Sequence, residues 1–247
     1  MELPRSFINT SLLFTKEKFA RLEHSKIGIV GIGGVGSWAA EALVRSGVQN
    51  LVLIDPDNVF ESNINRQSQA SHLTLGLAKV DASERILLTI NPRLAIKKYE
   101  DHLSESTADL ILSQENACFW IDACDDLKAK IALIMALKRR KNIKSLLICG
   151  AVGGKTNPQA IHTSDLAETK QDPLLAKLRY QLRKKFQFPK QGKMNLSCVS
   201  SSERMTPNNT DVTKSGKISC SGYGSIVTVT ATMGMLAASE AIKKLTY

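Results

Sequence analysis

The stretch IGIVGIGGVGSWAAEALVRSGVQNLVLIDPD, residues 27–57, decides the fold of this chain. It reads as a buried strand, a glycine-rich turn, a helix and a second strand that ends in two acids. The glycines at positions 31, 33, 34 and 36 allow a tight turn, a close approach of the backbone to a phosphate, and close packing of helix on strand. Backbone N–H groups at the start of the helix then face an anion. The pattern predicts a nucleotide site, but the motif serves NAD, FAD and ATP alike, and a purely structural turn is the alternative.

Outward from this stretch, strand-like apolar runs alternate with helical runs. We expect strands at 26–30, 50–55, 95–100, 117–122 and 144–150, and helices at 34–46, 76–90 and 125–141. This alternation predicts an α/β fold, a Rossmann-like doubly wound and mostly parallel sheet covered on both faces. After residue 150 we expect a loop and a short strand, a helix at 171–186 with Pro173 in its first turn, a polar loop at 187–218 and a C-terminal helix. The chain is interpreted as one domain, residues 1–247, with a nucleotide-binding core at 1–150 and a substrate-side extension at 151–247.

The composition is that of an ordinary soluble globular protein, with 43% hydrophobic and 23% charged residues among 247. Five scattered cysteines and the lack of a signal peptide favour a reducing cytoplasm. The uncharged segment Ser219–Ser239 has the length of a membrane span, but about half of it is Ser, Thr or Gly. We therefore expect no membrane association, and a buried helix in the core or at a subunit interface. The net charge of +10 favours an anionic partner, most commonly a nucleic acid.

Four residues downstream of the glycines bear on which nucleotide binds. Asp55 ends the second strand at about the spacing of the acid that accepts ribose hydroxyls, and Asp57 is a second candidate for that role. Neither acid separates ATP from NAD. Arg66 and Lys79 do, because two cations there suit the breaking of a triphosphate and have no use in hydride transfer. A solvated surface position is the alternative for both cations.

Five motifs together resemble the ubiquitin-activating-enzyme-like (ThiF/MoeB/HesA) adenylyltransferases: GIGGVGSWAAEAL (31–43), LIDPD (53–57), SNINRQ (62–67), GLAKV (76–80) and DACDD (122–126). Members activate a carboxylate with ATP and Mg²⁺. The resemblance implies that Asp55 holds the ribose, that Asp125 organises Mg²⁺ near the α-phosphate, and that Asn63, Arg66 and Lys79 meet the phosphates. Gln67 is a further candidate for nucleotide binding. Arg66, Lys79 and Asp125 are then the catalytic candidates. For Asp125 a helix N-cap is the alternative reading.

The second half resembles the tRNA threonylcarbamoyladenosine dehydratase branch of that superfamily, through TSDLAETKQDPLLAKLRYQLRK (163–184), LSCVSSSE (196–203) and SCSGYGSIVTVTATMGMLA (219–237). The branch implies ATP-dependent cyclisation of threonylcarbamoyladenosine beside the anticodon, in which the carboxylate is activated and an internal nitrogen closes the ring. The 1–150 region is then the ATP-binding core and the remainder the tRNA side. An activator of a ubiquitin-like or sulfur-carrier protein is the alternative, and a sulfur-transfer protein stays open as a partner. No C-x-x-C pair is present, so no zinc site of the sulfur-carrier type is expected.

The stretch from Lys177 to Lys193 holds seven cations in 17 residues, with Tyr180 and Phe186 between them. Such a stretch can grip a phosphate backbone, although a solvated helix face is the alternative. The candidates for tRNA contact are Lys177, Arg179, Arg183, Lys184 and Lys185.

The N-terminus departs from the family pattern. Relatives generally begin with an RT-x-L-L-x-G-like stretch whose Arg is thought to reach the partner's ATP in a homodimer, whereas INTSLLF (8–14) places Asn9 there. Arg5 is nearby but is not aligned. We still expect a homodimer. Cys198 and Cys220 are interpreted as small buried side chains, because ring closure by the substrate's own nitrogen needs no enzyme thiol.

Overall fold

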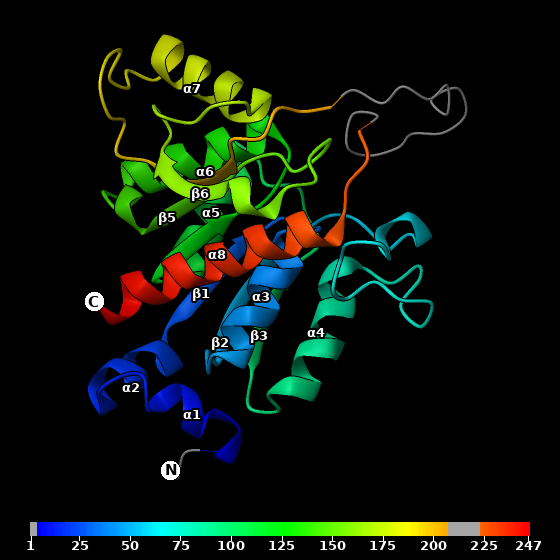
Figure 1. Ribbon diagram of the computed structural model, residues 1–247. Coiled ribbons are helices and arrows are strands. Elements are labelled where there is room, and N and C mark those ends of the chain that lie inside the picture. Colours follow the sequence, from blue (N-terminus) through cyan, green and yellow to red (C-terminus); the bar gives the residue numbers. More distant parts are fainter. Residues whose placement is uncertain (1–3, 207–222) are drawn as a thin grey trace.

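The fold is built on one seven-stranded sheet in the order β3-β2-β1-β4-β5-β7-β6 (Figure 1). The computed structural model describes residues 4–206 and 223–247. The strands are β1 (Lys26–Val30), β2 (Asn50–Ile54), β3 (Ala95–Tyr99), β4 (Phe119–Asp122), β5 (Leu146–Cys149), β6 (Ile161–Asp165) and β7 (Ser197–Ser201). All neighbouring pairs are parallel except β6 and β7. The predicted doubly wound, mostly parallel α/β sheet is confirmed.

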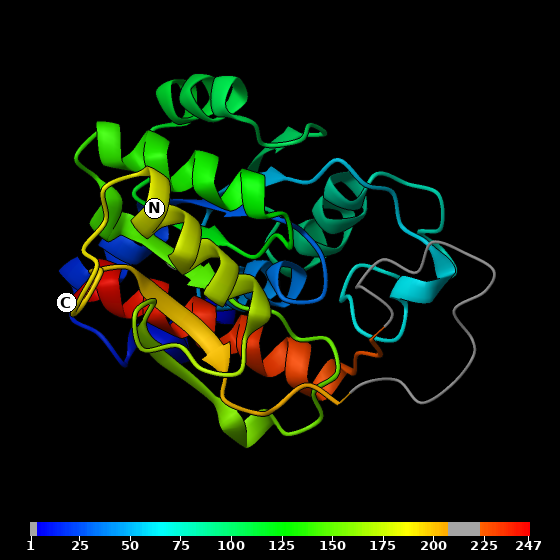
Figure 2. The same cartoon turned by 90° about the horizontal axis from the view of Figure 1, so that it is seen from above.

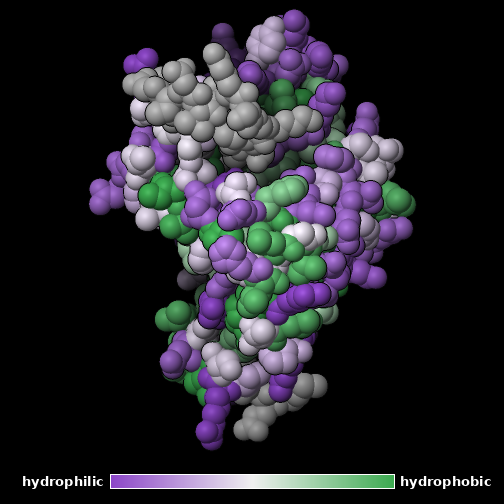
Figure 3. All heavy atoms as spheres, turned by 90° about the vertical axis from the view of Figure 1, so that its right-hand side faces the viewer, coloured by the Kyte–Doolittle hydropathy of each residue, from purple (hydrophilic) through white to green (hydrophobic). Residues whose placement is uncertain are grey.

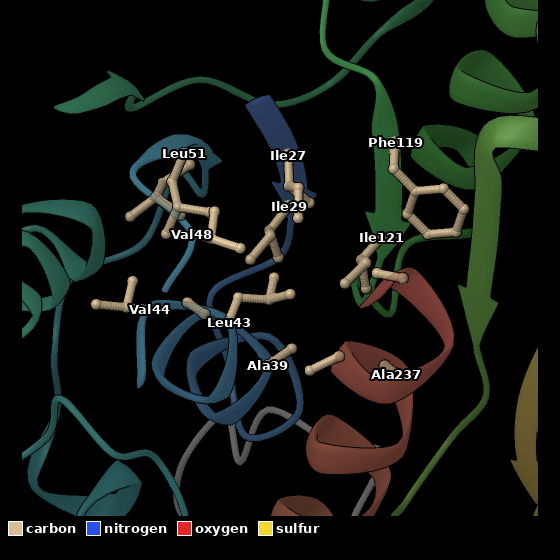
Figure 4. Packing of buried hydrophobic residues seen from close by; sticks show 14 of the residues in the cluster. Ile27, Ile29, Ala39, Leu43, Val44, Val48, Leu51, Phe119, Ile121 and Ala237 are labelled. Carbon is tan, nitrogen blue, oxygen red and sulfur yellow. The ribbon is translucent and has the colours of Figure 1, made fainter. Parts of the chain in front are cut away.

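Helices cover both faces of the sheet. One face packs against α3 (Gly36–Arg45), α4 (Lys79–Ile90) and α8 (Val227–Thr246). The other packs against α5 (Glu105–Glu115), α6 (Leu127–Arg139) and α7 (Pro173–Lys185). In the first layer Ile29 of β1 and Ile121 of β4 meet Leu43 of α3 and Ala237 of α8 (Figure 4). Burial of apolar surface on both faces explains why the central strands are continuous hydrophobic runs.

The segment Ser219–Ser239 only partly follows its expectation. Residues 219–222 lie outside the described part of the chain, and the helix α8 begins at Val227 and continues to Thr246. Its buried side includes Val229, Met233 and Ala237, so the core version of the prediction is confirmed for this side. Met235 is 43% exposed and lies on the outer side. Within the described residues, no helix has both the length and the hydropathy needed to cross a membrane.

Four elements were not expected from the sequence. The helix α5 falls in a region to which no element was assigned, and the N-terminal residues form α1 (Ile8–Ser11) and α2 (Lys16–His24). The predicted loop at 187–218 is wrong in its middle, because Ser197–Ser201 forms β7 and pairs in parallel with β5. This strand is buried from Cys198 onward although its sequence, SCVSS, is mostly serine. Hydropathy alone does not reveal a buried strand of serines.

One glycine ties together two distant points of the chain. The N–H of Gly154 donates to the carbonyl of Gly224 at 2.7 Å, and its carbonyl accepts from the N–H of Thr206 at 2.9 Å. Gly154 has φ +70°, and a Cβ there would lie 3.1 Å from the carbonyl oxygen of Thr206. The loop after β5 therefore holds the chain both before and after residues 207–222.

Candidate nucleotide-binding site

The glycine loop follows β1 at the carboxyl edge of the sheet, where nucleotides bind in folds of this type. Gly31 has φ +84°, and a Cβ there would lie 2.6 Å from the backbone N of Cys124. A Cβ at Gly36 would lie 1.9 Å from the carbonyl oxygen of Gly31. By contrast, the nearest atom to a Cβ at Gly33 would be Nε2 of Gln67, at 4.0 Å. Two glycines thus pack the loop against its neighbours and the third leaves its backbone open, as a cradle for a phosphate requires.

Gly34 lies on the packed side of the loop. A Cβ there would come within 3.0 Å of Cγ2 of Thr230, on α8. The C-terminal helix therefore supports the glycine loop directly, although the two are far apart in the sequence.

Asp55 holds the glycine loop in place. Its Oδ2 accepts a hydrogen bond from the N–H of Ile32 at 2.6 Å, and its Oδ1 accepts one from the N–H of Asp57 at 2.9 Å. Asp55 is 4% exposed, and burial raises the pKa of its carboxyl although the charge of Lys79 and these two hydrogen bonds lower it. A carboxylate has about four acceptor positions, so hydroxyl groups of a ribose remain compatible with this arrangement.

Lys79 begins α4 and turns toward the two acids. Its Nζ lies 2.6 Å from Oδ2 of Asp57 and 3.6 Å from Oδ1 of Asp55. The side chain of Lys79 is 8% exposed whereas that of Asp57 is 58% exposed. The solvated interpretation of Lys79 is therefore wrong, and a buried ammonium group lies beside the glycine loop.

The loop after β2 carries the other phosphate-side candidates. The Asn63 side chain accepts from the N–H of Phe60 at 3.1 Å, and its backbone carbonyl accepts from the N–H groups of Arg66 and Gln67. The guanidinium of Arg66 donates to the carbonyl of Ser62 at 2.6 Å. Arg66 is 9% exposed, so its solvated interpretation is also wrong.

Two residues that the sequence did not single out bind this loop to the site. Trp38 of α3 donates from its indole to the carbonyl of Arg66 at 2.9 Å. Gln69 donates to the carbonyl of Ile32 at 2.8 Å and to Oε1 of Gln67 at 3.1 Å. The hydrogen bonds of Gln69 connect the loop carrying Arg66 to the glycine loop.

Asp125 lies in the turn between β4 and α6, next to the glycine loop, because Cys124 packs on Gly31. It is exposed, and the N-cap of α6 is its neighbour Asp126, whose Oδ1 accepts from the N–H of Lys128 at 2.8 Å. The capping alternative for Asp125 is therefore wrong. An exposed carboxylate beside the phosphate loop is a suitable ligand for a magnesium ion held by a nucleotide.

A buried ion pair below this turn was not predicted. Asp122 and Lys130 are both fully buried, with Nζ of Lys130 3.0 Å from Oδ1 of Asp122. The same Nζ donates to the carbonyl of Cys149 at 3.0 Å, so the ends of β4 and β5 are tied together. Although burial would lower it, the charge of Asp122 raises the pKa of Lys130 above its ordinary value. The pair fixes the strand ends from which the Asp125 turn departs.

Two further predicted features lie away from this site. Arg179 of α7 is half-buried and donates to the carbonyl of Leu166 at 2.9 Å, a structural role that the sequence did not indicate. Lys177, Lys184 and Lys185 are exposed on the same helix, and Arg183 donates to the carbonyl of Pro189.

The remaining candidates are Cys198, Cys220 and Asn9. Cys198 is buried in β7, which raises the pKa of its thiol well above the ordinary value, while Cys220 lies outside the described residues. Asn9 belongs to α1, and Phe7 just before it lies near Gly47, at the end of α3 opposite to the glycine loop. Asn9 therefore lies far from the nucleotide site of its own chain.

Comparisons with known proteins agree with this geometry. The model of the ThiF family matches residues 8–247. The chain is 40% identical to a tRNA threonylcarbamoyladenosine dehydratase of Haemophilus influenzae, over 94% of this chain and 90% of that protein, and 37% identical to the one of Escherichia coli, over 97% and 92%. The crystal structure of the E. coli enzyme in complex with ATP superposes with a TM-score of 0.87, at 36% identity, over 98% of this chain and 93% of that one. The corresponding complex with AMP gives a TM-score of 0.89 over 98% and 94%.

Proposed function

This chain belongs to the ThiF family, and on that basis we propose that it is an ATP-dependent tRNA threonylcarbamoyladenosine dehydratase. The observation that carries the proposal is the grouping of Asp55, Arg66, Lys79 and Asp125 around the glycine loop, in a chain that matches named dehydratases over almost its whole length. The reaction activates the side-chain carboxylate of threonylcarbamoyladenosine. A nitrogen of the same substrate then attacks the activated carbonyl, and the ring closes with net loss of water.

The residues of this chain contribute binding and charge. The open backbone at Gly33 and the start of α3 receive phosphate oxygens, and Asp55 receives the ribose hydroxyls while it fixes the loop through Ile32. Arg66 and Lys79 offset negative charge that builds up when the phosphate bond breaks. ATP supplies the leaving group when it is bound. No enzyme nucleophile is needed, which agrees with the buried, high-pKa thiol of Cys198.

Mg²⁺ at Asp125 is part of the proposal. The support is that Asp125 is exposed and that Asp126, not Asp125, caps α6. The carboxylate of Asp125 is therefore not used as a helix cap. A hard divalent cation prefers carboxylate and phosphate oxygens.

A homodimer is also part of the proposal. A hollow of about 430 Å³ lies between the N-terminal helices and α8, lined in part by Leu13, Met235, Ile242 and Tyr247. Leu13 is 76% exposed and Tyr247 87% exposed. Hydrophobic residues also gather in the middle of the face on the α4 side of the molecule (Figure 3). Exposed apolar surface of this kind is typical of interfaces.

We place the enzyme in the cytoplasm with its tRNA substrate. Cys118, Cys124, Cys149 and Cys198 are free thiols, which agrees with a reducing compartment. Among the candidate tRNA contacts, Lys177, Lys184 and Lys185 are exposed and so are available to phosphates. A sulfur-transfer protein as a further partner stays a prediction, and no surface of residues 4–206 and 223–247 is assigned to it.

The function is tested by nucleoside analysis. The purified protein is incubated with tRNA that carries threonylcarbamoyladenosine, with ATP and Mg²⁺, and the nucleosides are separated under mild conditions that preserve the cyclic product. We expect cyclisation with wild type, and a loss of at least about a hundredfold in Arg66→Ala, which removes a positive charge at the phosphates, and in Asp125→Ala, which removes the carboxylate proposed to hold Mg²⁺. Asp126→Asn, which retains the cap, is the matched control and should remain active. If wild type forms no cyclic product, the assignment is rejected, whether or not the protein activates a ubiquitin-like or sulfur-carrier protein instead.

A further inference from the structure

The positive charge of this chain is concentrated in one part of it. Residues 127–202 contain sixteen Lys and Arg and three Asp and Glu, a net charge of +13, whereas the whole chain carries +10. The remaining residues, with seventeen cations and twenty acids, are therefore net −3. Within the basic part, the stretches 127–164 and 173–202 contain no acid at all. The net positive charge of the molecule thus comes from this part alone.

The two acid-free stretches meet in space, because α6 and α7 lie side by side (Figure 2). Nζ of Lys138, in the last turn of α6, donates to the carbonyl of Phe186 at 3.1 Å and lies 4.3 Å from the centre of the Phe188 ring. A hollow of about 500 Å³ lies between them, with Lys138 and Lys144 on one side and Phe188 and Asn195 on the other. The contact joins both stretches into one surface.

We call this surface the basic face. Its exposed cations are Lys138, Arg139, Arg140, Lys141, Lys144, Lys184, Lys185, Lys190 and Lys193. Arg139 is paired with Asp109 at 2.6 Å, and Lys184 donates to the hydroxyl of Tyr180 at 3.0 Å. No other cation of the face has a carboxylate within 4 Å among the residues that the structure describes. Their charge is therefore available to a ligand.

The basic face lies at the end of α6 that is remote from the nucleotide site. The helix begins at Leu127, two residues after Asp125, and ends at Arg139. Its 13 residues span about 20 Å at 1.5 Å per residue. A ligand that touches both the basic face and the Asp125 turn must be an extended polyanion at least that long.

We propose that the basic face binds the sugar–phosphate backbone of the tRNA stem that leads away from the reacting nucleotide. The identity of the RNA rests on the proposed function. Backbone contacts orient a nucleic acid without reading its sequence, and exposed lysines are well suited to them. An acidic protein is a weaker fit, because protein interfaces are depleted in lysine and depend on apolar anchors.

The test compares two triple variants of the full-length protein. In the first, Arg140→Gln, Lys141→Asn and Lys144→Gln remove three cations of the basic face. Asn is chosen at position 141 because that residue has φ 56°, which Asn tolerates. In the matched control, Arg85→Gln, Arg93→Gln and Lys97→Gln remove three exposed cations outside residues 127–202. Thermal unfolding of both variants first establishes that they fold.

Affinity for an unmodified tRNA transcript is measured over a series of salt concentrations. The slope of log affinity against log salt should become less steep by about 2 to 3 in the basic-face variant, since each lost phosphate contact contributes roughly 0.7–0.9. The control should keep the wild-type slope. Affinity for ATP should be unchanged in both, and turnover at saturating tRNA should remain near that of wild type. An RNA hairpin that copies the tRNA stem and loop with the reacting nucleotide is also tested, at full and at shortened stem length. The shortened hairpin should bind wild type less tightly than the full one, and its affinities for wild type and for the basic-face variant should differ less.

Binding and chemistry are measured separately, so that the two proposals can fail separately. A wild-type slope in the basic-face variant, or an equal loss in the control, overturns the basic face as the tRNA surface even if cyclisation is observed. Tight binding of polyglutamate without measurable binding of tRNA overturns it as well. A wild type that binds tRNA through the basic face but forms no cyclic product supports this inference for RNA binding and rejects the proposed reaction.

Discussion

At the scale of single residues, the polar side chains of the nucleotide site serve the fold as well as the ligand. Asp55 holds the N–H of Ile32 and the N–H of Asp57, and it lies beside the buried ammonium group of Lys79. Its burial raises its pKa because the charged form loses water, and the cation beside it offsets only part of that loss. A carboxyl kept at the site at this cost to stability is typical of a group required for binding.

The raised pKa of Asp55 makes stability depend on pH. A carboxyl whose pKa is higher in the folded state binds its proton more tightly there, so its contribution is fully present below the unfolded pKa, about 3.9, and is lost as pH rises through the folded pKa. Asp55→Asn does not titrate. The free energy of unfolding of wild type minus that of Asp55→Asn should therefore decrease as pH rises from about 3 to 7. Urea unfolding at a series of pH values measures it, with the exposed Asp101→Asn as control, and a difference that does not change with pH would contradict the argument.

The sequence could predict the residues of the site whose motifs are local. Asp55 and Asp125 each follow a strand, so strand ends bring them to one edge, and Lys79 begins the helix that follows the loop of residues 55–78. It could not predict Asp122 with Lys130, because a lysine at that place in a helix pattern is expected to face water. Gln69 was likewise missed, because its role depends on the hydrogen bond to the carbonyl of Ile32 across the site.

At the scale of elements, the mostly parallel sheet follows from alternating apolar runs, but the strand β7 and the helix α5 escape that signal. The strand β7, SCVSS, lies between β5 and β6 and is buried from Cys198 onward although three of its five residues are serine, so it is specified by its neighbours and not by its own hydropathy. The helix α5 presents only part of its surface to the core, with Ala108, Ile111 and Leu112 buried and Leu110 exposed. A short helix with so mixed a pattern is difficult to separate from a loop.

The crossing of α3 and α8 gives a test at this scale. A Cβ at Gly234 would lie 2.5 Å from the carbonyl oxygen of Val35 and 2.8 Å from Cβ of Trp38. Gly234→Ala should therefore destabilise the protein by about 1–3 kcal/mol, because overpacking exceeds the roughly 1 kcal/mol gain in helix propensity. Thr232→Ala, on the exposed side of the same helix, should change stability by less than about 0.5 kcal/mol.

Chemical denaturation of both variants and of wild type measures these changes in the free energy of unfolding. Because Val35 and Trp38 adjoin the glycine loop, Gly234→Ala should also weaken ATP binding, which isothermal titration would detect. A variant of wild-type or greater stability would show that the two helices move apart without cost.

At the scale of the whole molecule, the N-terminal helices and the end of α8 lie together near the C-terminal end of α3, and the glycine loop lies at the other end of that helix (Figure 1). If Asn9 or Arg5 acts on a nucleotide, it acts on that of a second copy. In the proposed homodimer, assembly would therefore complete the site, and Asn9 stands where the family resemblance implies an Arg.

The dimer has a direct test. Light scattering should give twice the chain mass of 27.0 kDa for wild type. Met235→Arg places a charge on the exposed side of α8 and should shift the protein toward monomer, since an unpaired charge in an apolar interface costs several kcal/mol. Leu110→Arg makes the same change on α5, on the other side of the sheet, and should leave the mass unchanged. An active wild-type monomer would rule out the assembly.

The tie made by Gly154 has a consequence for how this chain tolerates change. Thr206 and Gly224 are hydrogen-bonded to the two polar groups of one residue, so the intervening segment begins and ends at nearly the same point. The closure entropy of such a segment grows only with the logarithm of its length, by about 0.6 kcal/mol for each doubling. Insertions and deletions between these two anchors should therefore leave the sheet and the helices undisturbed. A peptide grafted between these two anchors should leave the stability of the sheet and the helices close to that of wild type.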